Sequence, residues 1–319
     1  MSARRVVVTG GAGFVGAALC TRLVREGWDV RVIDDCRLGS LANWPNDVAS
    51  EIDHGKIDIC DGEAVEGFLR TAEPETVYHL AAIHFIPLCE AQPTRAIDVN
   101  VIGTQSVLDA CARVSSDSSI VFTSSGAVYA PSSVAHSEGS ATGPTDVYGH
   151  TKLWGEQLLR LHHIKTGAGM GVARLFNVFG PGETNPHFIP AVIVQAKAAD
   201  TLQLGNLATR RDYIFTDDVA EALSLIGRDA VGGELDTFNV GAERALSGED
   251  VLAAASELLG RKLTPAVDSR RVRPSDRPLL LSNSARARER LGWRARTSLA
   301  DGLQAAFRRP LGDGVDISG

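Results

Sequence analysis

The sequence lacks any long uninterrupted apolar stretch, although 44% of its 319 residues are hydrophobic. No run reaches the roughly 20 residues that a membrane-spanning helix needs. The first residues, Met1 to Arg5, lead into a strand pattern and not into the apolar region and cleavage site of a signal peptide. We therefore expect a soluble, cytoplasmic protein with no membrane partner, long enough to bury one large core or two closely packed ones.

Cysteine is scarce, and histidine follows no ligand pattern. The five cysteines are odd in number and form no C-x-x-C pair, which excludes an obvious disulfide framework or zinc-binding motif. The eight histidines include no H-E-x-x-H or similar spacing. The sequence therefore predicts a protein without a bound metal.

An excess of basic charge is also missing, because the formal net charge is −7. This balance argues against a nucleic-acid partner. Residues 261–319 differ from the rest, with thirteen Lys and Arg against six Asp and Glu. Most of these side chains are typical of a solvated face, but Arg270, Arg271 and Arg273 lie close enough in sequence to clamp a phosphate. The C-terminal segment is thus predicted to attract an anion.

What the sequence does contain is a cluster of glycines near its start. Three valines at positions 6–8 predict a buried strand, and the Gly-Ala-Gly-Phe-Val-Gly segment at 11–16 follows it and fits G-x-G-x-x-G. A helix over 17–25 would come next. In a dinucleotide-binding fold these glycines form the sharp turn and bring backbone N–H groups close to a pyrophosphate. The cofactor-binding residues predicted here are Gly10, Gly13, Phe14, Val15 and Gly16.

A second apolar strand, at residues 30–33, ends in Asp34, eighteen residues beyond Gly16. A carboxylate at this point would accept hydrogen bonds from both adenine-ribose hydroxyls. A 2′-phosphate would instead meet like charge, so the predicted cofactor is NAD. Arg37 is near enough in sequence to leave NADP open.

Later strands also end in polar or small residues, at the edge where ligands bind in a doubly wound sheet. Residues 56–59 predict a short strand that places Asp58, beside Ile59, at its carboxyl end, where Asp58 either bonds the adenine amino group or holds a turn. Residues 76–80 predict a buried strand that runs into Ala81 and Ala82, which are small enough to let the cofactor pass closely. Residues 119–123 predict a strand that leads to Ser125.

Tyr148 and Lys152 are spaced i, i+4 and therefore share one face of a predicted helix. An ammonium group near a phenol favours the phenolate, which would lower the pKa of the tyrosine from about 10 toward working pH. A tyrosine tuned in this way can act as the general base for an alcohol. Because the pair follows the glycine loop and a serine-bearing strand end, we interpret it as catalytic.

The remaining pattern predicts an α/β fold: a Rossmann-type doubly wound parallel sheet with a smaller C-terminal substrate-binding region. Helical periodicity is predicted over 93–112, 189–199 and 217–228, with strands at 170–175 and 238–240 and a capped helix from Ser247. We assign residues 1–176 to the NAD-binding domain and 177–319 mainly to the substrate region. Segments near 212–259 are expected to return to the Rossmann domain.

Six motifs, taken in order, resemble the extended short-chain dehydrogenase/reductase proteins of the nucleotide-sugar epimerase and dehydratase family, of the UDP-glucose 4-epimerase type. The resemblance covers almost the whole chain. The motifs are Thr-Gly-Gly-Ala-Gly-Phe-Val-Gly at 9–16, His-Leu-Ala-Ala at 79–82, Asn-Val-Ile-Gly-Thr at 100–104, Ser-Ser-Gly-Ala-Val-Tyr at 124–129, Tyr-Gly-His-Thr-Lys at 148–152, and Arg-Leu-Phe-Asn-Val-Phe-Gly-Pro at 174–181.

The resemblance implies a catalytic triad of Ser125, Tyr148 and Lys152. Ser125 would hold the sugar 4-hydroxyl, Tyr148 would remove its proton, and Lys152 would tune Tyr148 and bind the nicotinamide ribose. It also implies a nucleotide-diphosphate sugar, with a UDP-hexose favoured, and a homodimer formed through the helices near 93–112 and 148–163. The further residues that it assigns are Asn100 for the cofactor and Asn177, Asn185, Arg211 and Arg273 for the nucleotide diphosphate.

Gly126 and Ala127 bear on which reaction is catalysed. In the related 4,6-dehydratases these positions hold Asp and Glu, and the related decarboxylases keep a Glu at the second one. Here neither side chain ionises, and small residues leave the space in which a 4-keto intermediate can turn. The prediction is an NAD-dependent 4-epimerase. The alternative is an NAD(P)H-dependent 4-keto-sugar reductase, followed by a 4,6-dehydratase, a decarboxylase or a non-catalytic NAD-binding module.

Two segments depart from the 4-epimerase pattern. His84 stands in the stretch His-Phe-Ile-Pro at 84–87, in a loop expected to approach the sugar, and it either contacts substrate or is satisfied by backbone groups. Residues 204–212 are similar to the corresponding segment of GDP-mannose dehydratases and reductases. The identity of the nucleotide therefore stays open at this point.

Overall fold

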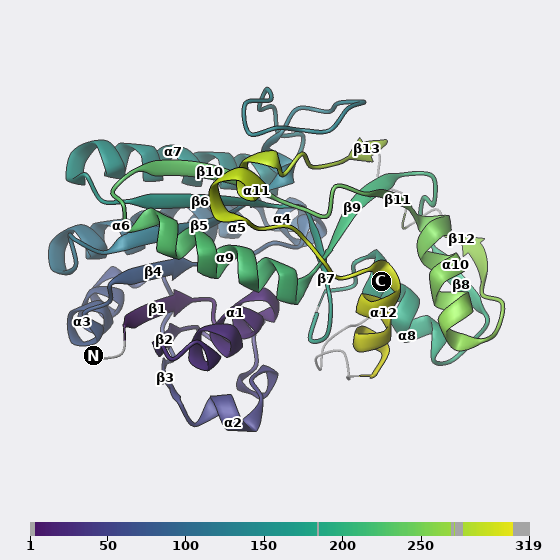
Figure 1. The fold of residues 1–319 in the computed structure, drawn as a ribbon, viewed down its shortest axis with the longest axis horizontal. Coiled ribbons are helices and arrows are strands. Elements are labelled where there is room, and N and C mark those ends of the chain that lie inside the picture. The colour runs from purple at the N-terminus through teal and green to yellow at the C-terminus, as the bar shows by residue number, and fades with distance from the viewer. Residues whose placement is uncertain (1–3, 184, 269–270, 272–276, 309–319) are drawn as a thin grey trace.

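A parallel seven-stranded sheet forms the centre of the fold (Figure 1). The computed structural model describes residues 4–183, 185–268, 271 and 277–308. The strand order is β10-β6-β5-β4-β1-β2-β3, and every neighbouring pair is parallel. Its strands are β1 (Arg5–Thr9), β2 (Asp29–Ile33), β3 (Ile52–Gly55), β4 (Thr76–His79), β5 (Ser119–Ser125), β6 (Met170–Leu175) and β10 (Leu235–Val240).

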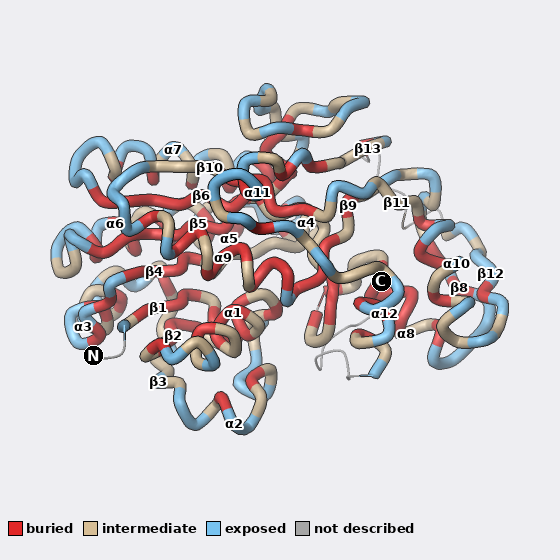
Figure 2. Tube along the Cα trace, in the orientation of Figure 1, coloured by how far each residue is buried: buried red, intermediate tan, exposed pale blue. Residues whose placement is uncertain are grey.

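Helices cover both faces of this sheet, which explains why its central strands are apolar on both sides. One face carries α1 (Phe14–Arg25), α9 (Thr216–Ala230) and α11 (Ala285–Leu291), with α1 packed on α9. The other carries α3 (Gly62–Ala72), α6 (Gly103–Val114) and α7 (Val147–Thr166), with α6 between the other two. Two buried cores lie against the sheet, one on each face (Figure 2). The predicted Rossmann-type architecture is confirmed.

A smaller unit, on the right in Figure 1, has its own core. It contains a second sheet in the order β11-β9-β13, with β7 also paired to β9, and a two-stranded sheet of β12 and β8. The α10 helix begins in a capping box, in which Ser247 and Asp250 satisfy each other's backbone N–H groups. The elements are β7 (Asn177–Phe179), α8 (Phe188–Ala196), β8 (Thr201–Leu204), β9 (Arg210–Phe215), β11 (Ala245–Ser247), α10 (Gly248–Leu259), β12 (Thr264–Val267), β13 (Leu279–Leu280) and α12 (Leu299–Arg308).

Between β9 and β11 the chain leaves the smaller unit, because α9 covers the central sheet and β10 pairs with β6 at the sheet edge. Short helical segments complete the described fold. They are η1 (Leu41–Asn43), α2 (Asn46–Ala49), α4 (Ile86–Ala91), α5 (Pro93–Ile97), η2 (Asp98–Ile102) and η3 (Gly126–Val128).

Two predicted elements need correction. The strand predicted over 56–59 lies earlier, as β3, and Ile57 and Ile59 continue into the core from the loop after it. The helix predicted over 93–112 is not uniform, because η2 is a π-helical turn between α5 and α6. Among the described residues, no helix combines the length and apolar character needed to cross a membrane.

Candidate active site

A cavity of 1320 Å³ opens at the carboxyl ends of the central strands, where the residues after β1, β2, β4, β5 and β6 form one wall. This is the edge at which a doubly wound sheet binds its ligands. The opposite wall comes from α8, β9 and the turn after β8. Sites for single small ligands usually measure about 300–1,000 Å³, so this cavity has room for a cofactor and a substrate together.

The glycine loop forms one end of the cavity. Gly10, Gly13, Phe14, Val15 and Gly16 all line it. A side chain on Gly16 would bring a Cβ within 2.0 Å of the Gly10 carbonyl oxygen, so only glycine allows this tight turn. The α1 helix begins here without a capping side chain and without an acidic residue in its first turn. Its first N–H groups therefore remain available to an anion, and this donor set fits the pyrophosphate of NAD.

Asp34 lies at the end of β2 with its side chain against the cavity. Its Oδ2 accepts a hydrogen bond from the Ala12 backbone N–H at 3.0 Å, and its Oδ1 accepts one from the Cys36 N–H at 2.8 Å. Burial raises the pKa of this carboxyl above its ordinary value, and the two backbone hydrogen bonds oppose that effect. Each oxygen keeps further acceptor capacity, which suits the two hydroxyls of an adenine ribose.

Arg37, the residue that left NADP possible as the cofactor, forms ion pairs with carboxylates. It lies 3.2 Å from Asp35 and 3.2 Å from Asp58, and Arg95 also contacts Asp58 at 3.2 Å. Asp58 lines the cavity, as does Ile59, but it stands three residues beyond the end of β3, not at a strand end. Its Oδ1 accepts the Cys60 N–H at 2.9 Å. The carboxylate of Asp58 thus holds a turn and two arginines at the cavity wall.

Ala81 and Ala82 line the cavity as predicted from their position after β4, whereas Asn100 does not. Asn100 is buried in the π-helical turn η2, and its side chain bonds both backbone groups of Ile83 and the hydroxyl of Thr151. Its side-chain amide is therefore used inside the protein. The prediction that Asn100 contacts the cofactor directly is replaced by a role in positioning the loop that follows Ala82.

Ser125, Tyr148 and Lys152 meet at the centre of the cavity wall. Ser125 ends β5, and its Oγ accepts the Ala127 N–H at 3.1 Å. Tyr148 stands in the first turn of α7, whose start is fixed by the Asp146 side chain accepting the Gly149 N–H. The Tyr148 hydroxyl is hydrogen-bonded to Ser125. Lys152 lies one turn further along α7 and is almost fully buried.

The ionisation of this triad differs from the sequence prediction. Burial raises the pKa of Tyr148 above its ordinary value, against the opposing hydrogen bond from Ser125. Burial also lowers the pKa of Lys152 to about 7. The Lys152 ammonium lies 6.0 Å from the centre of the Tyr148 ring and 4.8 Å from that of Phe122. The pKa of Tyr148 is therefore raised by burial and not lowered as the sequence indicated.

Buried polar groups hold the triad strands in place. His79 bonds Thr9 at 2.7 Å and Thr104 at 2.9 Å, and burial lowers its pKa to about 3, so the ring is neutral. Behind Ser125, the Glu156 carboxylate accepts the Ser124 hydroxyl at 2.5 Å and forms a bidentate pair with Arg174. His79 and Arg174 thus hold the strands by hydrogen bonds and an ion pair, and neither borders the cavity.

The predicted substrate residues are only partly assembled around the cavity. Asn177 and Arg211 line it, and the Oδ1 of Asn177 is buried with no hydrogen-bond partner among the residues that the structure describes. Asn185 does not line it, because its side chain bonds His84 instead. Arg271 lines the cavity, while Arg270 and Arg273 lie outside the described residues. An orphaned amide oxygen in the wall of a cavity that also contains arginines fits a polar ligand that brings its own donors.

Gly126 and Ala127 follow Ser125 in the η3 turn and are buried. A Cβ on Gly126 would approach the Phe176 ring to 3.3 Å, so a larger side chain at this position would have to displace that ring. Ala127 borders the cavity. No ionisable side chain therefore stands at either position, as the sequence indicates.

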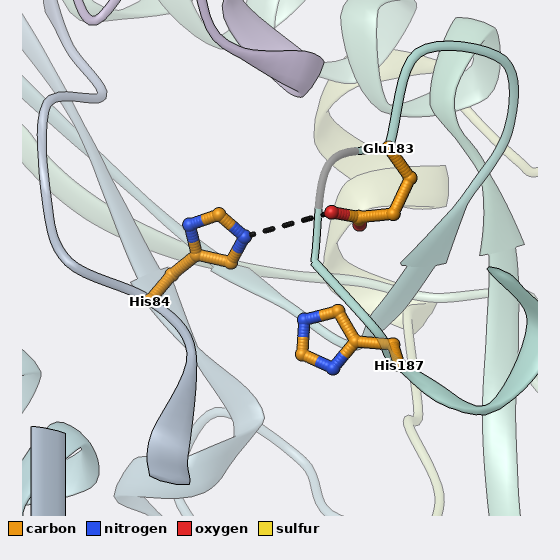
Figure 3. Close-up of side chains that lie close together, drawn as sticks. All are labelled: His84, Glu183 and His187. Carbon is orange, nitrogen blue, oxygen red and sulfur yellow. Dashed lines mark ion pairs between the residues drawn. The ribbon is translucent and has the colours of Figure 1, made fainter. Parts of the chain in front are cut away.

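Sequence reasoning missed one cluster in the cavity wall. His84 from the loop after β4 faces Glu183 and His187 from the loop before α8, and all three border the cavity (Figure 3). The three candidate metal-ligand atoms lie within 4.8 Å of one another. Since His84 and Glu183 stand about a hundred residues apart, no local motif could have joined them. The only signal was the unusual His-Phe-Ile-Pro stretch.

Comparisons with known proteins identify the family. Residues 6–241 match the family described as NAD dependent epimerase/dehydratase family. A UDP-glucose 4-epimerase from Mycolicibacterium smegmatis is 32% identical over 94% of this chain and 96% of its own. A UDP-glucose 4-epimerase from Brucella ovis, solved in complex with NAD, has 29% identity and a TM-score of 0.86, covering 96% of this chain and 98% of that one. A UDP-glucose 4-epimerase from Thermotoga maritima, solved with UDP-glucose, has 26% identity and a TM-score of 0.84, covering 95% and 97%. The chain belongs to the NAD-dependent epimerase/dehydratase family, as its motifs predicted.

Proposed function

We propose that the chain is an NAD-dependent nucleotide-diphosphate-sugar 4-epimerase. The observation that carries the proposal is the Ser125, Tyr148 and Lys152 triad, followed by Gly126 and Ala127 with no ionisable group. The UDP-glucose 4-epimerases to which the chain is similar over most of its length support the same activity and favour a UDP-hexose. The glycine loop and Asp34 would hold the cofactor.

The triad supplies the proton chemistry of this reaction. Ser125 would receive the sugar 4-hydroxyl, and Tyr148, as the phenolate that the positive charges of bound NAD⁺ and Lys152 would favour, would take its proton. Bound NAD⁺ supplies a positive charge and the hydride acceptor. Lys152, whose pKa burial lowers to about 7, would bind the nicotinamide ribose and tune Tyr148. Tyr148 would return the proton to the sugar oxygen at the end of the reaction.

Epimerisation also requires the 4-keto sugar to turn over and present its other face. Ala127 occupies the position where a dehydratase would hold a glutamate. The cavity wall beside Ser125 therefore carries no charge at this position and has only a small side chain there. Asn177 and Arg211 would keep the diphosphate in place during this movement. Arg273 would join them as first expected, and Arg271, which borders the cavity, is a second candidate.

The first prediction separates the epimerase from a 4-keto-sugar reductase with the same triad. The purified protein, incubated with UDP-, dTDP- and GDP-hexoses without added cofactor, should interconvert the 4-epimers of at least one sugar, and we expect UDP to be preferred. Mass spectrometry and chromatography would detect the products. Product formed only with stoichiometric NADH or NADPH would instead establish the reductase, and the same panel identifies the nucleotide.

The second prediction is that the protein forms a homodimer through α7 and the adjoining η2 and α6 segment. On α7 the side chains of Trp154, Leu161 and Ile164 are 42%, 54% and 71% exposed, and Ile102 of η2 is 54% exposed. Such a surface is large and apolar for a helix facing water. Light scattering at micromolar concentration should give twice the chain mass, and Leu161→Asp should reduce it. A stable monomer of the unmodified chain would refute the pairing.

Two further assignments belong to this proposal. Residues 1–176 form the NAD-binding domain and 177–319 mainly the substrate region, and α9 and β10 pack on the central sheet in the way expected for segments that return to the first domain. The location is cytoplasmic. All five cysteines are unpaired, which is typical of a reducing compartment.

A further inference from the structure

His84, Glu183 and His187 converge on one point of the cavity wall from separate loops. His84 follows β4, Glu183 follows β7, and His187 is the N-cap residue of α8 (Figure 3). The His84 Nε2 and Glu183 Oε1 atoms are 4.0 Å apart, and one ligand atom from each of the three residues falls within a 4.8 Å set. The Glu183 side chain is only 3% exposed, whereas that of His84 is 38% exposed.

The separations suit a small cation lying between the three atoms. Zinc bonds imidazole nitrogen and carboxylate oxygen at roughly 2.0–2.2 Å, so an ion can already span two atoms 4.0 Å apart. A tetrahedral angle requires these atoms to approach to about 3.4 Å. His84 can make this adjustment by a small side-chain rotation, because it stands in a loop and is partly exposed. Glu183 is buried, so its carboxylate is expected to keep its position while His84 moves.

Asn185 orients two of the three groups. Its backbone N–H donates to Glu183 Oε1 at 2.9 Å, and its side-chain Nδ2 donates to His84 Nε2 at 2.9 Å. An amide nitrogen can only donate, so His84 Nε2 accepts with its one in-plane lone pair, and a metal ion bound at this nitrogen would displace the hydrogen bond from Asn185. The backbone hydrogen bond from Asn185 to Glu183 would remain, since ligating carboxylates are typically held by such outer hydrogen bonds.

We propose that His84, Glu183 and His187 bind one divalent transition-metal ion of the zinc class. Two imidazoles and one carboxylate favour such an ion over magnesium or calcium, which prefer oxygen ligands. Three protein ligands with a fourth position open to a cavity are typical of catalytic zinc sites, and all three residues border this cavity. The single carboxylate leaves the ion with net positive charge, so the open position would take an oxygen atom of the substrate.

This proposal reverses the expectation of no metal, which rested on the absence of a local ligand motif. It does not depend on the 4-epimerase assignment, because the ion is expected to bind without substrate. It also gives His84 a different role from the direct sugar contact first considered for it.

Metal binding to the full-length protein tests the proposal. After chelator treatment and buffer exchange, calorimetric titration with ZnCl₂ should give one ion per chain. His84→Ala and His187→Ala should each weaken binding by at least about tenfold, as loss of a ligand or its support typically does. Addition of CoCl₂ should produce the intense visible absorption of tetrahedral cobalt, and both variants should lose it. The histidine variants keep the test valid if a change at the buried Glu183 disturbs folding.

His150→Ala is the matched control, since His150 is exposed on α7 and does not border the cavity. It should bind zinc as the unmodified chain does. Absence of stoichiometric binding to the unmodified protein would overturn the proposal. So would His84→Ala and His187→Ala variants that bind zinc as tightly as the His150→Ala control, because the ion would then lie elsewhere.

Discussion

Tyr148→Phe is expected to lower the epimerisation rate by roughly 10²- to 10⁴-fold, the range typical of losing a general acid–base group. The substitution removes only the phenolic oxygen, which is bonded to Ser125 at the cavity wall. Without this oxygen nothing in the triad is placed to take the proton of the sugar 4-hydroxyl directly.

Tyr78→Phe provides the control for this experiment. Tyr78 is fully buried in β4, does not border the cavity, and its hydroxyl has no hydrogen-bond partner among the described residues. The rate should therefore be kept. Both variants should retain bound NAD, which can be measured as the nucleotide released when the protein is denatured. The difference between their rates then reports the chemical step. An unchanged rate in Tyr148→Phe would refute the assigned base and revive a non-catalytic NAD-binding role.

The central sheet could be predicted well because its signals are local. The valines of β1 and the apolar run of β6 have no alternative but a buried strand, and the predicted bounds 170–175 for β6 agree with the structure. The edge strand β3 was misplaced because it contains little apolar surface, whereas Ile57 and Ile59 alternate like a strand while packing in a loop. Edge strands depend on pairing with β2, which the sequence does not display.

The position of a site residue could be predicted when it depends only on a local feature, such as the end of one strand or one turn of a helix. Ser125, Tyr148 and Lys152 meet these conditions, and the structure brings them together. Asn100 does not, because the π-helical turn directs its amide to Ile83. Long-range contacts were inaccessible as well. Arg277, for example, bonds the carbonyl oxygens of Ala127 and Tyr129 across some 150 residues.

We expect Asp34 to decide the choice between NAD and NADP, but its hydrogen bonds complicate the obvious experiment. Both carboxylate oxygens already accept backbone N–H groups, from Ala12 in the glycine loop and from Cys36. Asp34→Ala would leave those two donors without their acceptor and would loosen the loop that holds the pyrophosphate. Binding of either cofactor would suffer from this loosening. The ratio of the two affinities, in which the shared loss cancels, is therefore the proper measure.

In the unmodified protein NAD should bind more tightly than NADP by tenfold or more. A ribose hydroxyl that donates to the Asp34 carboxylate contributes about 1.5 kcal/mol, and NADP, whose 2′-oxygen carries the phosphate, loses one such hydrogen bond, which corresponds to roughly tenfold in affinity. A 2′-phosphate adds close to two negative charges beside the same carboxylate. Arg37 offsets little of this, because it is engaged by Asp35 and Asp58.

Calorimetry with both cofactors on the unmodified protein and on Asp34→Ala should show the ratio falling toward one, chiefly through weaker NAD binding. Asp29→Ala is the control, since Asp29 starts the same strand at its opposite end. Its ratio should match that of the unmodified protein. NADP binding as tightly as NAD before any substitution would show that Asp34 does not bind the ribose. Because a reductase can use either reduced cofactor, that result would also favour the 4-keto-sugar reductase over the epimerase.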